Sequence, residues 1–178
     1  MLLIHDLNVK DSNEIIPLLP PNSKIFSKEI DNIKGCLGCF NCWVKTPGKC
    51  IIKDAYTEMP KYILERGTFI IVTEIKYGCY TSYIKNVIDR FSNGLLLPFF
   101  QSVNGEIHHL PRYNNNSLKF IVIGYGEDVT SDEEQTFKDL IRRNAINLCV
   151  TEITSYVIKD ISEAKTILEN LQEEGIII

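Results

Sequence analysis

The sequence predicts an α/β protein built around one parallel sheet, and two observations predict this class. Apolar stretches of strand length alternate with helical patterns along the whole chain. Two of the stretches, residues 68–75 and 118–126, are continuously apolar and rich in β-branched residues, which is typical of strands buried on both faces. Because parallel strands need crossover connections, helices are expected on both faces of the sheet.

Five strands and five helices are expected in alternation. The expected strands cover residues 2–7, 23–27, 68–75, 118–126 and 151–158. The expected helices cover residues 11–19, 54–67, 81–93, 131–148 and 160–175. Pro17 cuts the first helix short, while Asp54 and Gly67 are a suitable N-cap and stop for the second. The strict alternation makes a doubly wound sheet the expected arrangement.

Capping signals support the last two helices, since Ser131 with Glu134 and Asp160 with Glu163 have the spacing of capping boxes. Five strands in this alternation fit the flavodoxin-like doubly wound fold, in which the strand order is 2-1-3-4-5. The chain is expected to be a single domain, residues 1–178, with a cysteine-rich loop at 34–53 and an insertion at 94–117.

Composition excludes two classes of partner. The net charge is −4 and no basic stripe is present, so a nucleic acid is not an expected partner. No apolar run is long enough to span a membrane, and the N-terminal residues lack the apolar stretch of a signal peptide. A cytoplasmic location is therefore expected, where cysteine thiols stay reduced.

The loops after the third and fourth expected strands are candidates for ligand binding, because ligands of such folds sit at the carboxyl ends of the strands. These loops read KYGCYTSY and GYGED. Glycine permits close backbone approach and tyrosine can stack on a planar ring, so a flat aromatic cofactor is the expected ligand. The alternative is that Tyr77, Tyr80 and Tyr125 only cover the end of the sheet.

A longer pattern connects these residues with a known family. The chain has C-x-x-C-x-x-C…C…D before a helix, then a strand, then YGCYTSYIKNVIDR, which contains Lys85, Asp89 and Arg90. This resembles the NADPH-dependent FMN reductase and iron-sulfur flavoprotein branch of the flavodoxin-like superfamily. The resemblance implies FMN at the strand ends, NAD(P)H as the reductant, and hydride or electron transfer to a small-molecule substrate or electron acceptor.

The resemblance also implies which residues bind the flavin. These are Tyr77, Gly78, Tyr80, Thr81 and Ser82, with Gly124 and Gly126 on the other side of the ring and Asn8 near the phosphate. The family's first loop is usually Gly-Ser-x-Arg…Gly-Asn-Thr, but this chain has HDLNVKDSNE, in which Asp6, Asp11 and Glu14 add negative charge. The alternative function is therefore a flavodoxin-fold electron carrier or non-catalytic binding protein that has lost tight FMN binding.

Four cysteines lie close together in the loop before the expected helix 54–67. Cys36, Cys39, Cys42 and Cys50 have the spacing C-x2-C-x2-C-x7-C. Four thiolates can hold a [4Fe-4S] cluster, and iron-sulfur flavoproteins have a similar compact motif. Zinc also accepts four thiolates, although this spacing wraps a single ion awkwardly. A set of bare thiols that hold no metal is the third alternative.

The insertion at 94–117 contains two further features. His108, His109 and Arg112 are candidate catalytic residues, as proton donor and anion clamp of a lid, unless the segment is only a surface hairpin with solvated charges. The insertion also has an apolar run that a monomer would expose, which predicts a homodimer unless the insertion buries the run itself. The run consists of Leu95, Leu96, Leu97, Phe99 and Phe100.

Overall fold

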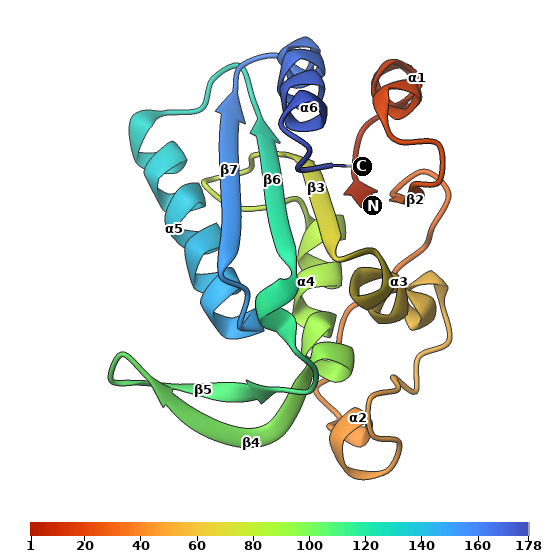
Figure 1. The fold of residues 1–178 in the computed structure, drawn as a ribbon, viewed down its shortest axis with the longest axis vertical. Coiled ribbons are helices and arrows are strands. Elements are labelled where there is room, and N and C mark those ends of the chain that lie inside the picture. The colour runs from red at the N-terminus through yellow and green to blue at the C-terminus, as the bar shows by residue number, and fades with distance from the viewer. Residues whose placement is uncertain (178) are drawn as a thin grey trace.

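The computed structural model describes residues 1–177 and has a five-stranded parallel sheet at its centre (Figure 1). The sheet consists of β1 (Leu2–His5), β2 (Lys24–Ser27), β3 (Thr68–Glu74), β6 (Lys119–Tyr125) and β7 (Glu152–Ile158). The strand order is β2-β1-β3-β6-β7, and every neighbouring pair is parallel. The chain therefore has the flavodoxin-like fold, and the predicted order is confirmed.

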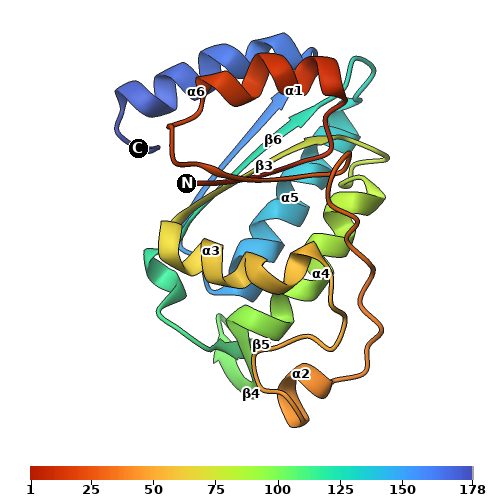
Figure 2. The ribbon, with the colours of Figure 1, turned by 90° about the vertical axis from the view of Figure 1, so that its right-hand side faces the viewer.

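Helices cover both faces of the sheet. The α-helices that pack on it are α1 (Val9–Ile15), α3 (Met59–Arg66), α4 (Ser82–Leu95), α5 (Ser131–Leu148) and α6 (Ala164–Glu173). Short 3₁₀ segments occur at Ile16–Leu18, Ala55–Glu58, Asn115–Ser117 and Ile161–Glu163. Helices α1 and α6 lie on one face and α3, α4 and α5 on the other (Figure 2). Within residues 1–177, no helix has both the length and the apolar character needed to cross a bilayer.

Two apolar cores follow from this layering, one on each face of the sheet. On the α3–α5 face, Phe69 and Phe120 stack with ring centroids 4.7 Å apart on the central strands. Gly67 ends α3 in the left-handed conformation, as the sequence predicts. Helix α5 has the predicted bounds, but its capping box is Thr130 with Glu133 rather than Ser131 with Glu134. The segment TSDEE contains both registers, so the pattern alone does not distinguish them.

The insertion forms an antiparallel hairpin of β4 (Leu96–Val103) and β5 (Glu106–Pro111). Helix α4 starts at the carboxyl end of β3 and runs back along the sheet, so the hairpin that follows it lies at the amino end of the strands (Figure 1). The hairpin folds back and buries Leu95 and Leu96, which are 0% and 5% exposed. The expectation that these two leucines are exposed is therefore wrong, whereas Phe99 and Phe100 are exposed.

Candidate functional site

Asp6 joins two loops at the carboxyl edge of the sheet. Its carboxylate, which is almost fully buried, accepts hydrogen bonds from Thr73 Oγ1 at 2.5 Å and from the Glu74 backbone N–H at 3.1 Å. The Thr81 hydroxyl also donates to it. Burial raises the pKa of this carboxyl, although the three hydrogen bonds oppose the shift. The loops after β1 and β3 are thus held together by a buried acidic group.

The loop after β3 makes a tight turn against α5. Lys76 and Cys79 exchange two backbone hydrogen bonds of 2.9 Å, and Tyr77 and Gly78 between them both have positive φ angles. This is the two-residue turn that favours glycine. A Cβ on Gly78 would lie 2.9 Å from Cβ of Thr136 in α5, so the turn has no space there. The Tyr77 side chain is 92% exposed at the tip.

Two of the predicted flavin-lining residues lie in the core instead. The Tyr80 ring is 4% exposed, packs edge-on against Phe137 at 5.4 Å, and accepts a hydrogen bond from Asn144 Nδ2. Gly124 lies within β6, where an added Cβ would be 2.4 Å from the Phe137 ring. Both residues face α5 rather than the end of the sheet. The structure therefore does not place Tyr80 and Gly124 beside Tyr77 and Gly126 at this edge, and a contact of these two residues with a flavin stays a prediction.

A cavity of about 370 Å³ lies between the turn at 76–79 and the loop 126–129 that follows β6. Tyr77 and Gly126 border it, so the structure brings these two predicted residues together. Thr81 is instead engaged with Asp6, and Ser82 begins α4. The cavity is large enough for part of a flat ring system. Its other lining residues include carboxylates, namely Glu74, Glu127, Asp128 and Glu133.

The loop after β1 does not fit a phosphate. Asn8 caps α1 by accepting from the Asp11 backbone N–H at 3.0 Å, and its Nδ2 donates to Asp11 Oδ2 at 2.8 Å. Ser12 Oγ donates to the Asn8 carbonyl at 2.7 Å. These donors are already satisfied within the chain, and the Asp6 and Asp11 carboxylates would repel a dianion. The residues at this edge fit the ring of a flavin better than its phosphate.

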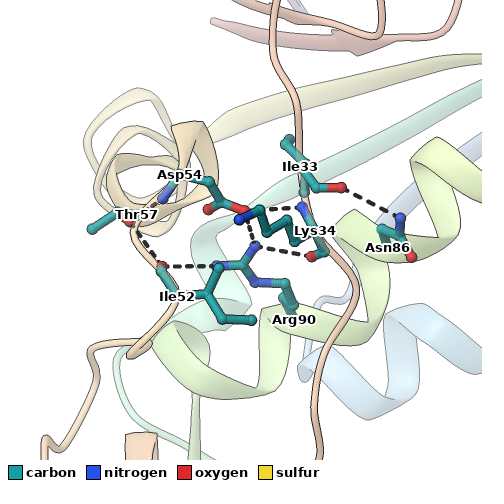
Figure 3. A network of polar contacts seen from close by, with 7 residues as sticks. All are labelled: Ile33, Lys34, Ile52, Asp54, Thr57, Asn86 and Arg90. Carbon is teal, nitrogen blue, oxygen red and sulfur yellow. Dashed lines mark hydrogen bonds and ion pairs between the residues drawn. The ribbon is translucent and has the colours of Figure 1, made fainter.

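The cysteine loop, residues 34–53, is anchored at both ends by Arg90 of α4 (Figure 3). The Arg90 guanidinium, which is 1% exposed, donates to Asp54 Oδ2 at 2.5 Å and to the Lys34 and Ile52 carbonyls at 3.0 and 3.4 Å. It also lies 4.3 Å from the centroid of the Tyr56 ring. Analysis of the sequence missed this role. In the sequence, the one indication that Arg90 is buried was its position three residues after Val87, on the apolar side of the expected helix 81–93.

The four clustered cysteines border one cavity of only about 20 Å³. Cys36 and Cys39 are exposed, whereas Cys42 and Cys50 are half-buried beside the short helix α2 (Asn41–Val44). Burial and the neighbouring Cys50 raise the pKa of the Cys42 thiol. Within residues 1–177, no three His, Cys, Asp or Glu side chains are placed to hold a metal ion. The thiols have the right chemistry for a cluster, but their arrangement does not fit one.

His108 connects the hairpin to α5. The ring is 6% exposed, with Nδ1 2.9 Å from Asn147 Oδ1 and Nε2 3.2 Å from Glu106 Oε2. Glu106 in turn accepts from Arg143 Nη1 at 2.7 Å. Both ring nitrogens are therefore engaged within the chain, and the contacts hold β5 against α5.

His109 and Arg112 also lie at the amino edge of the sheet. The His109 ring is between Trp43 and Phe100, with centroids 4.6 and 4.7 Å away, and Arg112 Nη2 donates to the Leu96 carbonyl at 3.3 Å. His108 and His109 border a cavity of about 330 Å³ beneath the hairpin. The turn at 76–79 is at the opposite end of the strands (Figure 1). The structure therefore does not bring the three predicted catalytic residues to the candidate flavin cavity within one chain.

Comparisons with known proteins agree on the fold. No family model matches the sequence, and no curated protein matches it. Among solved structures, an azoreductase from Bacillus anthracis str. Sterne is 11% identical, with a TM-score of 0.61 over 95% of this chain and 98% of that one. The azoreductase AzrA is 11% identical, with a TM-score of 0.57 over 97% and 95%. The Trp repressor binding protein of Bacillus subtilis is 14% identical, with a TM-score of 0.57 over 94% of each chain.

Proposed function

We propose that this protein is a flavin-dependent oxidoreductase that uses NAD(P)H as its reductant. The observation that carries the proposal is the cavity of about 370 Å³ between the turn at 76–79 and the loop 126–129. It lies at the carboxyl ends of β3 and β6, on the edge of the sheet where ligands of doubly wound folds bind and next to the switch point between β1 and β3. The fold shared with two azoreductases supports the same class of reaction.

The chain's own residues would hold the flavin by its ring. The flavin, when bound, supplies the hydride chemistry, and the protein supplies position and surroundings. The exposed Tyr77 ring can cover one face of a planar ligand. Gly126 lets Val129 pack closely, because a Cβ on Gly126 would lie 2.7 Å from Val129 Cγ2, and it thereby shapes the loop 126–129 beside the cavity. Because carboxylates line the cavity and the β1 loop has no free phosphate site, we propose that the flavin exchanges readily and that its phosphate adds little affinity.

A titration of flavin fluorescence tests the proposal. Tyr77→Ser should weaken riboflavin binding about fivefold, since stacking of one aromatic ring is worth roughly 1 kcal/mol. Tyr113→Ser is the matched control, because Tyr113 is also exposed but lies beyond the hairpin. Wild-type protein should bind FMN and riboflavin with similar affinity and oxidise NAD(P)H in their presence. If Tyr77→Ser and Tyr113→Ser lost the same amount of riboflavin affinity, the proposed cavity would be contradicted. Much tighter binding of FMN than of riboflavin would contradict the proposal that the protein holds the flavin mainly by its ring.

An iron-sulfur centre is not part of the proposed function. The four thiols around the cavity of about 20 Å³ do not form a metal-binding group among the described residues. Anaerobic purification followed by iron and sulfide analysis is the direct measurement. A brown protein with four irons per chain would show that the loop rearranges around a cluster, and stoichiometric zinc would favour the zinc alternative. Purified protein without iron or zinc would support the third alternative, in which the four thiols hold no metal.

The acidic β1 loop favours one alternative function, a flavodoxin-fold electron carrier or binding protein without tight FMN binding. In this alternative the buried Asp6 only joins the loops after β1 and β3. An absorbance scan and an NAD(P)H oxidation assay with added flavin distinguish the two functions. The alternative predicts no turnover even when flavin is present at saturating concentration.

We also propose that the hairpin mediates homodimerisation. Phe99, Phe100 and Ile107 remain exposed on it, at 62%, 66% and 76%. The register places Phe100 and Ile107 on one face of the hairpin, as diagonal neighbours, and exposed apolar patches commonly mark an interface. The mass of one chain is 20.4 kDa, and light scattering should give twice this mass for a homodimer with this interface. A monomer at micromolar concentration would contradict this.

A further inference from the structure

A separate cavity of about 400 Å³ lies between α1 and β2, on the outer side of β1. Four aliphatic side chains form most of its wall: Val9, Ile16, Ile25 and Ile30. Val9 and Ile30 at its rim are 61% and 85% exposed, which is unusual for large apolar side chains beside a cavity. The residues of this cavity do not overlap with those of the proposed flavin cavity, so the two can be tested independently.

The floor of this cavity has polar atoms without partners. His5 and Ser27 end neighbouring parallel strands and are register partners, so their side chains lie on the same face of the sheet. They are 1% and 4% exposed. Both ring nitrogens of His5 and Oγ of Ser27 are buried without a hydrogen-bond partner among the described residues. Each such atom costs stability unless water or a ligand pairs it, so these three atoms offer hydrogen bonds to a molecule in the cavity.

The chemistry of these groups restricts the ligand. Burial lowers the pKa of His5 to about 4, against a smaller opposing effect of Asp31, so the imidazole is neutral at neutral pH. A neutral imidazole offers one N–H donor and one acceptor, and a serine hydroxyl offers both. Glu29, Asp31 and Lys24 also border the cavity, so two carboxylates face one ammonium group and the net negative charge disfavours an anion.

We propose that this cavity binds a small, uncharged nitrogen heteroaromatic molecule about the size of a purine base. Such a ring presents a donor and an acceptor on one edge, which complements His5 and Ser27. Neighbouring strands are about 4.8 Å apart, so one ring can reach both side chains. The aliphatic walls then cover its faces, and small movements of Val9 and Ile30 admit the ring to the floor.

Chemical-shift mapping with ¹⁵N-labelled protein tests the proposal, with adenine as the probe. Adenine should cause saturable shifts at the amides of His5, Ser27 and Ile30. Indole, which has a donor but no acceptor beside it, and AMP, which adds a ribose and a charged phosphate at N9, should each bind at least tenfold more weakly. No saturable shift with adenine at millimolar concentration would overturn the proposal. Equal binding of indole would overturn the role of the polar floor.

His5→Phe separates binding from folding, because phenylalanine keeps a ring of similar size and removes both nitrogens. We expect adenine binding to fall at least tenfold while the melting temperature rises by about 2–4 °C, as unpaired polar atoms leave the interior. Ile30→Lys should also weaken binding, whereas Val44→Lys in α2 is a matched exposed control that should not. Unchanged adenine affinity in His5→Phe, with the fold intact, would overturn the proposal.

Discussion

The two ends of the sheet differ in how their polar residues are used. At the amino edge, a buried arginine, a tryptophan and two histidines connect the cysteine loop and the hairpin to α4 and α5. At the carboxyl edge, short loops surround two cavities lined by ordinary residues, and the side chains of His5 and Ser27 make no hydrogen bond there to any described residue. Arg90 and Arg112 at the amino edge also have an unpartnered nitrogen, but their other nitrogens hold segments of the chain together. The residue types that most suggest chemistry are therefore mainly structural here, and the better candidates for binding are defined by their place in the fold.

The long cysteine loop explains why the amino edge is so extensively connected. Residues 34–53 contain only the one-turn helix α2, so ordering them costs considerable conformational entropy. Arg90 offsets this by holding both ends, and Trp43 Nε1 donates to the Ser92 and Leu96 carbonyls at 3.2 and 3.3 Å. The loops after β1, β3 and β6 at the carboxyl edge are much shorter, so fewer side-chain contacts are needed to hold them.

The largest expected effect concerns the amino edge. Arg90→Met leaves the Asp54 carboxylate, 5% exposed, without its cation and should lower the free energy of unfolding by about 3–5 kcal/mol. Lys85→Met is the control on the same helix, because the Lys85–Asp89 pair is about half exposed and should contribute less than about 1 kcal/mol. Urea denaturation measures both. Similar losses in the two variants would show that Arg90 does not anchor the loop.

The role of Arg90 also shows what the sequence reveals and what it does not. The sheet and its order were predictable because buried strands such as 68–75 read as continuous apolar runs, and glycine marks the end of α3. The contact between Arg90 and Asp54 was not predictable, because 36 residues separate them in sequence and only the tertiary fold brings them together. The resemblance used the Lys-x3-Asp-Arg pattern only as a mark of the helix that follows the expected flavin-binding loop.

The candidate site was predicted in part. Glycine and tyrosine after β3 predicted a loop that borders a ligand, and the structure brings Tyr77 and Gly126 to one cavity. Tyr80 looked equivalent in sequence, but only the packing of α5 shows that its ring is in the core. Asp6 was treated as a charge that repels phosphate, whereas its hydrogen bonds to two threonines appear only when β1 and β3 are neighbours.

The next effect concerns His5 at the carboxyl edge. Its folded pKa of about 4 is below the unfolded value of 6.5, so the unfolded chain binds the proton more strongly between these values. The stability contribution is present above pH 6.5 and is lost as the pH falls towards 4, by roughly 3 kcal/mol. His5→Phe should remove this part of the pH dependence. Denaturation curves of the wild type and of His5→Phe at pH 4.5 and 7 measure this pH dependence. If both proteins lost the same free energy of unfolding between pH 7 and 4.5, a buried neutral histidine would be contradicted.

A smaller effect distinguishes a turn that packs on a helix from one that projects into solvent. Gly78→Ala should cost about 2–3 kcal/mol, because it combines a left-handed backbone with a contact of 2.9 Å to Thr136. Gly105→Ala in the hairpin has the same sign of φ but no atom within 4 Å of the added Cβ, so about 1 kcal/mol is expected. Thermal unfolding of both variants gives the difference, and equal losses would show that the turn at 76–79 does not press against α5.

The smallest effect tests where α5 begins, which also fixes the loop 126–129 beside the candidate flavin cavity. Thr130 Oγ1 accepts from the Glu133 backbone N–H at 3.3 Å, and the Glu133 carboxylate accepts from the Thr130 N–H at 3.0 Å. Thr130→Ala should therefore cost about 1 kcal/mol, while Ser131→Ala, one residue inside the helix, should cost less than about 0.5 kcal/mol. A larger loss of stability in Ser131→Ala than in Thr130→Ala would show that the capping box is Ser131 with Glu134, as predicted from the sequence. That register would also move the end of the loop by one residue and change which carboxylates face the cavity.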